Sequence, residues 1–313
     1  MKASPFRHDK VTAVHPSHPL PRETLERCAL RAQLRGDTML GTAFPAARLL
    51  LVEQPGPWGN EGLAHSRFDR SVALALEERA ARAGVRVLAI RRPGRTPRDA
   101  ARRWFFVDAR EGHEALFAGT FADDSELLSV PLDGTSGSRD DAPLYLTCAH
   151  SKHDTCCALR GRPVAAAIDE VRPGRAFECS HLGGDRFAAN VLVLPAGLLY
   201  GRVLPFAAAE FVAAAEADEV VGALLRGRIG VPSVAQAALA FAFEHLALRS
   251  RSALRVVSAP AIREGRSTVR LAGPHGEIDV TVEVERVKAD GLTCANPRPN
   301  QYLRYRPVVI RAV

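Results

Sequence analysis

Four of the six cysteines of this chain lie within 32 residues, from Cys148 to Cys179. Each of these two end residues directly follows a short run, 144–147 and 175–178, that has the length of a buried strand. Loops at the ends of neighbouring strands converge at one edge of a sheet, where functional side chains gather. The pattern therefore predicts an α/β fold that carries a cysteine-rich site, with three histidines in or next to the same segment: His150, His153 and His181.

The length and composition predict a globular protein of about two domains. The chain has 313 residues, of which 47% are hydrophobic and 25% charged, and a typical domain has roughly 150 residues. The net charge of +7 comes almost entirely from arginine. The basic run 91–98, with Arg102 and Arg103, is expected to be a solvated face, so a nucleic-acid partner is not expected.

The location predicted for this protein is the cytoplasm. Residues 1–8 contain no apolar run suited to an export signal. The apolar stretches 206–225 and 231–248 are interrupted by acidic or polar residues, so no membrane span is expected. Cysteines in the cytoplasm are mostly reduced, which favours metal binding or redox chemistry over structural disulfides.

We expect an N-terminal extension over residues 1–40, with a short helix at 22–34. A first α/β domain is predicted over 41–132, with strands at 49–52, 85–90 and 104–107 and a helix at 68–82. The polar segment 133–141 is the predicted domain boundary.

The second domain is predicted over 142–250. Its strands are expected at 144–147, 175–178, 191–194 and 198–203, and its helices at 161–171, 206–225 and 231–248, the last capped by Ser233. The order β-α-β-β-β-α is close to the thioredoxin arrangement. A C-terminal extension over 251–313 is predicted to be antiparallel, with strands at 267–272, 277–285 and 302–310.

The chemistry of the cluster follows from its donor types. Eight residues separate Cys148 from Cys157, and His181 follows after a further gap of 23. Thiolates suit iron–sulfur clusters or zinc, and imidazole replaces thiolate on one iron of Rieske centres. Gly183 and Gly184 would let the backbone bend around such a cofactor.

The segments 51–59, 147–150, 154–163, 180–190 and 199–203 together resemble the sucrase/ferredoxin-like family, a set of thioredoxin-like 2Fe-2S ferredoxins. The resemblance spans roughly residues 41–203. It implies a 2Fe-2S cluster with two cysteines, eight residues apart, on one iron and two histidines of a His-x-Gly-Gly-His motif on the other.

Carried over to this chain, the resemblance implies Cys148, Cys157 and His181 as ligands. Asp185 stands at the second histidine position. Because carboxylate is a harder ligand than imidazole, Cys179 is an equally ranked candidate for the fourth ligand, and Cys156 a lower one. Cys28 and Cys294 are predicted to be core residues, and His150 and His153 solvated loop residues.

The predicted function is electron transfer by a proton-coupled 2Fe-2S carrier with a protein redox partner, an unknown reductase or acceptor. Two alternatives use the same residues: a thioredoxin-like thiol oxidoreductase or redox sensor, and a structural zinc site. No catalytic residue is predicted. Sucrose hydrolysis would need a pair of carboxylates, and no pair stands out.

Overall fold

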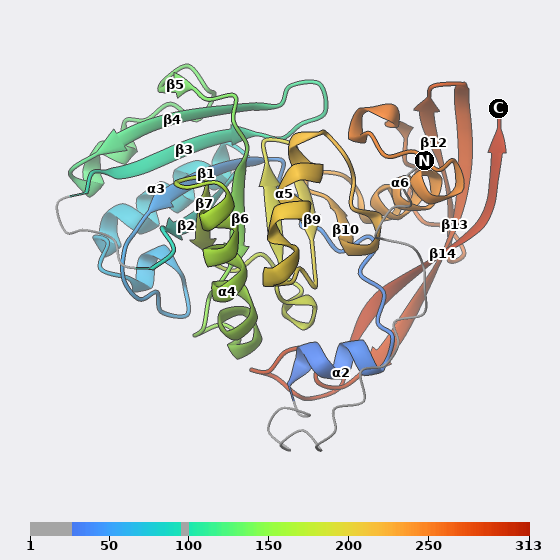
Figure 1. Cartoon of the computed structure of the whole chain (residues 1–313), viewed down its shortest axis with the longest axis horizontal. Coiled ribbons are helices and arrows are strands. Elements are labelled where there is room, and N and C mark those ends of the chain that lie inside the picture. Colours follow the sequence, from blue (N-terminus) through green and yellow to red (C-terminus); the bar gives the residue numbers. More distant parts are fainter. Residues whose placement is uncertain (1–26, 95–99) are drawn as a thin grey trace.

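The computed structural model describes residues 27–94 and 100–313. It has a large mixed sheet flanked by helices and, at one end, a separate antiparallel sheet of four strands (Figure 1). The predicted mixed α/β class and the antiparallel C-terminal region are therefore confirmed. Among the described residues, no helix has both the length and the apolar character needed to cross a bilayer.

The N-terminal half of the large sheet is built around a parallel pair of strands, β1 (Arg48–Glu53) and β2 (Val85–Arg91), connected by α3 (Arg70–Arg82). Asp69 caps α3 by accepting hydrogen bonds from the backbone N–H groups of Ser71 and Val72. Antiparallel strands continue the sheet from β1: β3 (Arg102–Asp108), β4 (Ala115–Phe121) and the short β5 (Ser138–Arg139).

The second half repeats the parallel crossover. Strands β6 (Leu144–Cys148) and β7 (Ala176–Cys179) run parallel and are connected by α4 (Thr155–Val171). On the other side of β6 lie the antiparallel strands β8 (Val191–Leu194), β9 (Leu198–Tyr200) and β10 (Leu225–Arg228). Helix α5 (Ala208–Glu216) packs beside α4 (Figure 1).

The two halves share one sheet. Strand β2 pairs antiparallel with β7, with Ile90 opposite Cys179, and the strand order is β10-β9-β8-β6-β7-β2-β1-β3-β4-β5. Strands on both sides of the segment 133–141 thus belong to one hydrogen-bonded sheet, so the predicted division into two domains has no counterpart as a break in the sheet.

The sheet separates the apolar core into layers because alternate side chains face opposite sides. One face carries a continuous cluster across both halves, including Leu49, Phe105, Leu146 and Cys148. The opposite face is covered by α3 in the first half and by α4 and α5 in the second. The cysteine-rich segment lies at the edge of the first of these clusters.

The C-terminal region packs helix α6 (Ser233–His245) on a second sheet with the order β11-β12-β13-β14. Its strands are β11 (Arg255–Ser258), β12 (Arg266–Gly273), β13 (Gly276–Ala289) and β14 (Asn300–Ala312). The long β13–β14 hairpin extends away from α6 and brings its end beside α2 (Cys28–Leu34) (Figure 1). The described part of the chain also contains the short 3-10 helices η1 (Leu63–His65), η2 (Asp124–Leu128), η3 (Asp185–Phe187), η4 (Pro205–Ala207), η5 (Gly222–Leu224) and η6 (Arg251–Ala253).

Several element boundaries differ from the prediction. Helix α4 begins six residues earlier than expected, so it includes Cys156 and Cys157. The helix predicted for 206–225 ends at Glu216, because Asp218 adopts a left-handed backbone conformation that stops it. Ser233 does not cap α6, since Pro232 occupies that position without a side-chain cap. The helix predicted for 22–34 is confirmed over its described part, where residues 28–34 form α2, and residues 22–26 lie outside the described residues.

The basic run is not a solvated face in its described part. Arg91 pairs with Glu178 at 2.6 Å, Arg92 with Glu53 at 2.8 Å and Arg102 with Asp124 at 2.5 Å. The carboxylate of Glu53 is buried, so it needs cationic partners, which Arg92 and Arg103 supply. These arginines therefore form ion pairs within the protein. Residues 95–99 of the run lie outside the described residues.

Candidate metal centre

The site begins where two parallel strands end together. Cys148 is the last residue of β6 and Cys179 the last residue of β7, and the two are paired in register. Both are fully buried. The sheet thus fixes the position of two thiols at one edge before any loop contributes.

Helix α4 brings the third thiol to this edge. Asp154 caps the helix by accepting a hydrogen bond from the backbone N–H of Cys156 at 2.8 Å. Gly161, one turn further, lies so close to β6 that an added Cβ would collide with the carbonyl oxygen of Cys148. This close approach places the Cys157 thiol within hydrogen-bonding reach of Cys148.

The loop after β7 supplies nitrogen and oxygen donors. Gly183 and Gly184 have φ of +79° and +68°, which side-chain-bearing residues rarely adopt, and the chain then turns through η3. This turn directs Asp185 inward: its Oδ1 lies 3.2 Å from Sγ of Cys157 and 3.2 Å from Nδ1 of His181. Asp185 is 3% exposed, so its carboxylate is shared between these two groups rather than with solvent.

A buried arginine supports the loop from behind. Arg226 on β10 is 1% exposed and donates hydrogen bonds to the carbonyl oxygen of Gly183 at 2.8 Å and to Oδ1 of Asn190 at 2.9 Å. Asn190 in turn donates to the carbonyl oxygen of Gly184 at 3.1 Å. Burial lowers the pKa of Arg226 to about 10, so it stays protonated at neutral pH and places a positive charge behind the thiols.

Two further histidines border the site, and neither is a plain solvated loop residue as predicted. The ring of His153 stacks on His181 with centroids 3.6 Å apart, and its Nε2 lies 3.8 Å from Oδ2 of Asp185. His150 is buried, and its Nε2 lies 2.6 Å from the carbonyl oxygen of Gly59. Both follow Cys148 in the tight turn before α4, and it is this turn that brings His153 back to the site.

The electrostatics favour anionic sulfur and oxygen beside a protonated imidazole. The hydrogen bond from Cys157 lowers the pKa of Cys148 well below that of a free thiol. Burial acts to lower the pKa of His181, but the neighbouring Asp185 and Cys148 outweigh it and raise this pKa to about 9. Burial acts in the opposite direction on Asp185, yet His181 outweighs it and lowers the pKa of that carboxyl. Such a set of anionic donors can bind a metal ion once the metal displaces the proton of the His181 imidazole.

The structure brings together Cys148, Cys157, His181 and Asp185, and adds His153. One donor atom each from His153, His181 and Asp185 lies within 4.8 Å of the others. Cys179 lies beside Cys148 on the neighbouring strand, and burial raises its pKa. Like Cys148 and Cys157, it belongs to neither group of close donors found among the described residues. Cys156 faces a different group, formed with Cys28, Cys294 and Asp154.

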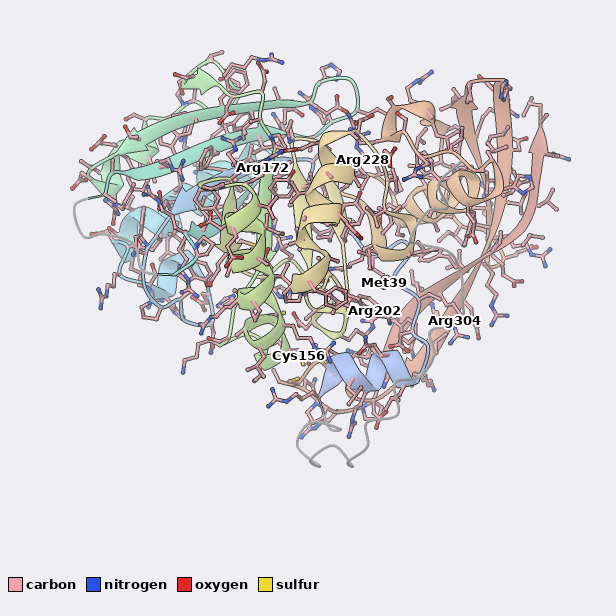
Figure 2. The ribbon with its side chains drawn as sticks, viewed as in Figure 1. Met39, Cys156, Arg172, Arg202, Arg228 and Arg304 are labelled. Atoms are coloured by element: carbon pink, nitrogen blue, oxygen red, sulfur yellow. The ribbon has the colours of Figure 1, made fainter. Side chains whose placement is uncertain are left out.

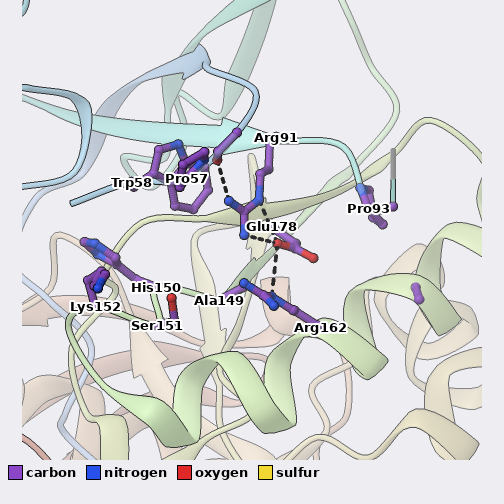
Figure 3. A pocket seen from close by; sticks show the side chains of 13 residues that line it. Pro57, Trp58, Arg91, Pro93, Ala149, His150, Ser151, Lys152, Arg162 and Glu178 are labelled. Atoms are coloured by element: carbon purple, nitrogen blue, oxygen red, sulfur yellow. Dashed lines mark hydrogen bonds and ion pairs between the residues drawn. The ribbon is translucent and has the colours of Figure 1, made fainter. Parts of the chain in front are cut away.

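A pocket of about 590 Å³ opens beside the site (Figure 3). His150 lines it together with Trp58, Arg91, Lys152, Arg162 and Glu178. The guanidinium of Arg91 lies over the Trp58 ring and donates to Glu178, and Arg162 also approaches that carboxylate (Figure 3). With three cationic side chains and one carboxylate, the pocket carries a net positive charge.

The fold and the site thus define an α/β protein. It carries a buried cluster of cysteine, histidine and aspartate at the end of its central strands. The sucrase/ferredoxin-like family model matches residues 39–227, more than half of the chain, and the chain belongs to this family. No curated protein matches the chain. No solved structure matches it either.

Proposed function

We propose that this protein is a one-electron carrier whose cofactor is a 2Fe-2S cluster held by Cys148, Cys157, His181 and Asp185. The observation that carries the proposal is a chain of contacts. Asp185 Oδ1 lies 3.2 Å from both the Cys157 sulfur and the His181 Nδ1, and the neighbouring Cys157 thiol lowers the pKa of Cys148. All four donors lie at one buried edge of the sheet, in a chain of a family whose name includes ferredoxin.

The donor set suits a cluster with two unlike irons. Cys148 and Cys157 are neighbouring thiols, and the carboxylate of Asp185 lies between Cys157 and the imidazole of His181. Nδ1 of His181 is buried, and its lone pair becomes available to a metal once the metal displaces the imidazole proton. These four residues are suitable ligands for a 2Fe-2S cluster. When bound, the cluster would supply reversible one-electron chemistry.

The chain's own residues have separate tasks in this proposal. His181 holds or releases a proton at its imidazole, so the charge of the site follows pH. Arg226 offsets the negative charge of the sulfurs from the buried side. Leu182 and Phe187, both fully buried, exclude water from the loop that carries His181 and Asp185.

We also propose that residues 144–216 form a thioredoxin-like unit. Four of its strands have the order β9-β8-β6-β7, in which β6 and β7 are parallel and β8 is antiparallel to both of its neighbours. Numbered along the unit, this is the order 4-3-1-2 with the third strand reversed. Helices α4 and α5 pack together against one face of it.

The redox partner in this proposal docks at the histidine side of the site. His181 and His153 are the most exposed of the donors, with side chains 30% and 39% accessible. His150 connects them to the basic pocket, because its ring centroid lies 5.8 Å from that of His153. The excess positive charge of the pocket favours a partner that presents acidic side chains there.

The experiment is an anaerobic purification followed by visible absorption, EPR, and iron and sulfide analysis. About two irons and two sulfides per chain, with a reduced-state EPR signal, would support the proposal. A colourless protein after growth with ample iron would overturn it. Zinc bound at Cys148 and Cys157, or a metal-free protein with a reactive Cys148 thiolate, would then identify the zinc or the thiol–redox alternative.

A further inference from the structure

A second cluster of sulfur and oxygen donors shares no residue with the first centre, the site formed by Cys148, Cys157, His181 and Asp185. Its members come from three elements: Cys28 from α2, Asp154 and Cys156 from the start of α4, and Cys294 from the loop that joins β13 to β14. Figure 2 shows Cys156 where the N-terminal end of α4 meets α2. Cys28 and Cys294 pack against the core as predicted, but they do so next to each other and to Cys156.

The donors are in mutual contact. Sγ of Cys294 lies 3.4 Å from Sγ of Cys156 and 3.5 Å from Sγ of Cys28. Sγ of Cys28 lies 3.7 Å from Oδ1 and 3.6 Å from Oδ2 of Asp154. One donor atom from each of the four residues lies within 4.8 Å of all the others.

These spacings match the edges of a tetrahedron around one metal ion. With zinc–sulfur bonds of about 2.3 Å and zinc–oxygen bonds of about 2.1 Å, tetrahedral geometry gives sulfur–sulfur edges of about 3.8 Å and sulfur–oxygen edges of about 3.6 Å. The two sulfur–sulfur contacts and the contact between Cys28 and Asp154 lie within roughly a few tenths of an ångström of these values. The remaining donor pairs lie within 4.8 Å. All four donors lie close enough together to surround one ion, so the geometry favours a single ion.

The carboxylate is fixed in place by the two loops that it joins. Oδ1 of Asp154 accepts a hydrogen bond from the backbone N–H of Cys156 at 2.8 Å, and Oδ2 accepts one from that of Cys294 at 2.6 Å. The backbone N–H of Cys28 donates to the sulfur of Cys294 at 3.5 Å. Hydrogen bonds of this kind orient metal ligands.

Burial points to a closed, structural site. Cys28, Cys156 and Asp154 are at most 2% exposed, and Cys294 is half-buried. Cys156 lies in the first turn of the 17-residue helix α4, where the helix dipole favours a thiolate. A disulfide explains the arrangement less well, because it would use two of the three sulfurs and leave the third, with the aspartate, without a role.

We propose that Cys28, Cys156, Cys294 and Asp154 bind one zinc ion. The ion joins the N-terminal helix α2, the start of α4 and the end of the β13–β14 hairpin, elements up to 266 residues apart in sequence. The first turn of α4 also carries Cys157, a residue of the first centre. The zinc ion would therefore fix the position of that turn.

The test is the zinc content of the full-length protein, purified anaerobically without chelators. About one zinc per chain is expected for the unaltered protein, and Cys28→Ser or Cys294→Ser should lower this by at least about tenfold. Cys148→Ser is the matched control: it alters the first centre, so it should reduce iron and leave zinc unchanged. The two proposals therefore fail independently.

X-ray absorption at the zinc edge of the unaltered protein covers the case in which a variant does not fold. Three sulfurs and one oxygen around zinc are expected. Two sulfurs with nitrogen would assign the zinc to Cys148, Cys157 and a histidine, and would overturn the proposal. A zinc-free protein whose intact mass is lower by the two hydrogens lost when a disulfide forms would also overturn the proposal. Zinc content that is unchanged in Cys28→Ser would overturn it as well.

Discussion

Cys156 and Cys157 are consecutive residues of α4, yet their sulfurs belong to different clusters. Sγ of Cys157 lies 3.2 Å from Oδ1 of Asp185, whereas Sγ of Cys156 lies 3.4 Å from Sγ of Cys294. Neighbouring residues of a helix project about 100° apart around its axis, so one turn can serve two sites. Substitutions at these two positions should therefore have separable effects on metal content.

The choice of fourth ligand can be decided by comparing Asp185→Ala with Cys179→Ser. We expect Asp185→Ala to lower iron content by at least about tenfold, because the Asp185 carboxylate contacts both Cys157 and His181. Cys179→Ser should retain iron. Iron and sulfide analysis measures both, and loss of iron in Cys179→Ser alone would identify Cys179 as the ligand instead.

Exchanging the charge of a ligand should move the reduction potential in opposite directions at the two positions. Asp185→His replaces an anionic donor with a neutral one and restores the His-x-Gly-Gly-His motif, so it should raise the potential. His181→Cys replaces a neutral, ionisable donor with a thiolate, so it should lower the potential and flatten its pH dependence. Potentiometric titrations from pH 6 to 9, roughly the range in which a ligand imidazole titrates, measure both effects. Shifts of the same sign in both variants would argue against this ligand set.

The stability of the metal-free protein should fall as the pH rises. The folded-state pKa of His181, about 9, exceeds the ordinary value of 6.5, because Asp185 and Cys148 outweigh the opposing effect of burial. The stabilisation by the protonated imidazole is thus complete below pH 6.5 and lost as the pH rises through 9. At about 1.4 kcal/mol per pH unit, the loss is at most about 3.5 kcal/mol.

Urea unfolding at several pH values checks this expectation, with His181→Gln as the test variant. The exposed His113, altered to Gln, provides the control and should keep the full pH dependence. Bound metal should reverse the trend, since it competes with protons for the imidazole. A pH dependence that survives in His181→Gln would assign the effect to another group.

Gly161→Ala should destabilise the protein by about 1–3 kcal/mol and disturb the first centre. The added Cβ would collide with the carbonyl oxygen of Cys148, and a backbone atom of β6 cannot move aside as a flexible side chain would. Gly222→Ala is the control, because its Cβ would meet no atom within 4 Å. Denaturant unfolding of both variants measures the difference, and equal stabilities would show that α4 can move away from β6 at little cost.

Arg226→Met should lower the free energy of unfolding by about 2–4 kcal/mol, because it leaves the buried acceptors on Gly183 and Asn190 unpaired. It should also lower the potential of the first centre by removing a nearby positive charge. Arg228→Met, two residues along β10, is the matched control. Arg228 pairs with Glu114 rather than with the site loop, so its loss should cost stability without moving the potential.

Much of the fold could be predicted because it follows from local patterns. The alternation at 277–285 and the apolar runs at 49–52 and 191–194 each correspond to a strand. The start of α4 was missed because its first turn is rich in cysteine and polar residues rather than periodic. The pairing of β2 with β7 involves residues about 90 positions apart, and no local pattern signals such a partner.

For the first centre, the spacing of Cys148, Cys157 and His181 predicted a cysteine-rich site for a metal cluster, with thiol redox chemistry as the alternative. Only the tertiary structure decided which of the remaining cysteine and aspartate residues belong to the first centre and which to the second cluster. It placed Asp185 against Cys157 through the left-handed turn at Gly183 and Gly184, and it turned Cys156 toward Cys28 and Cys294. Donor type is a property of single residues, whereas convergence depends on packing between distant segments, and that packing brings the hairpin end with Cys294 to α2.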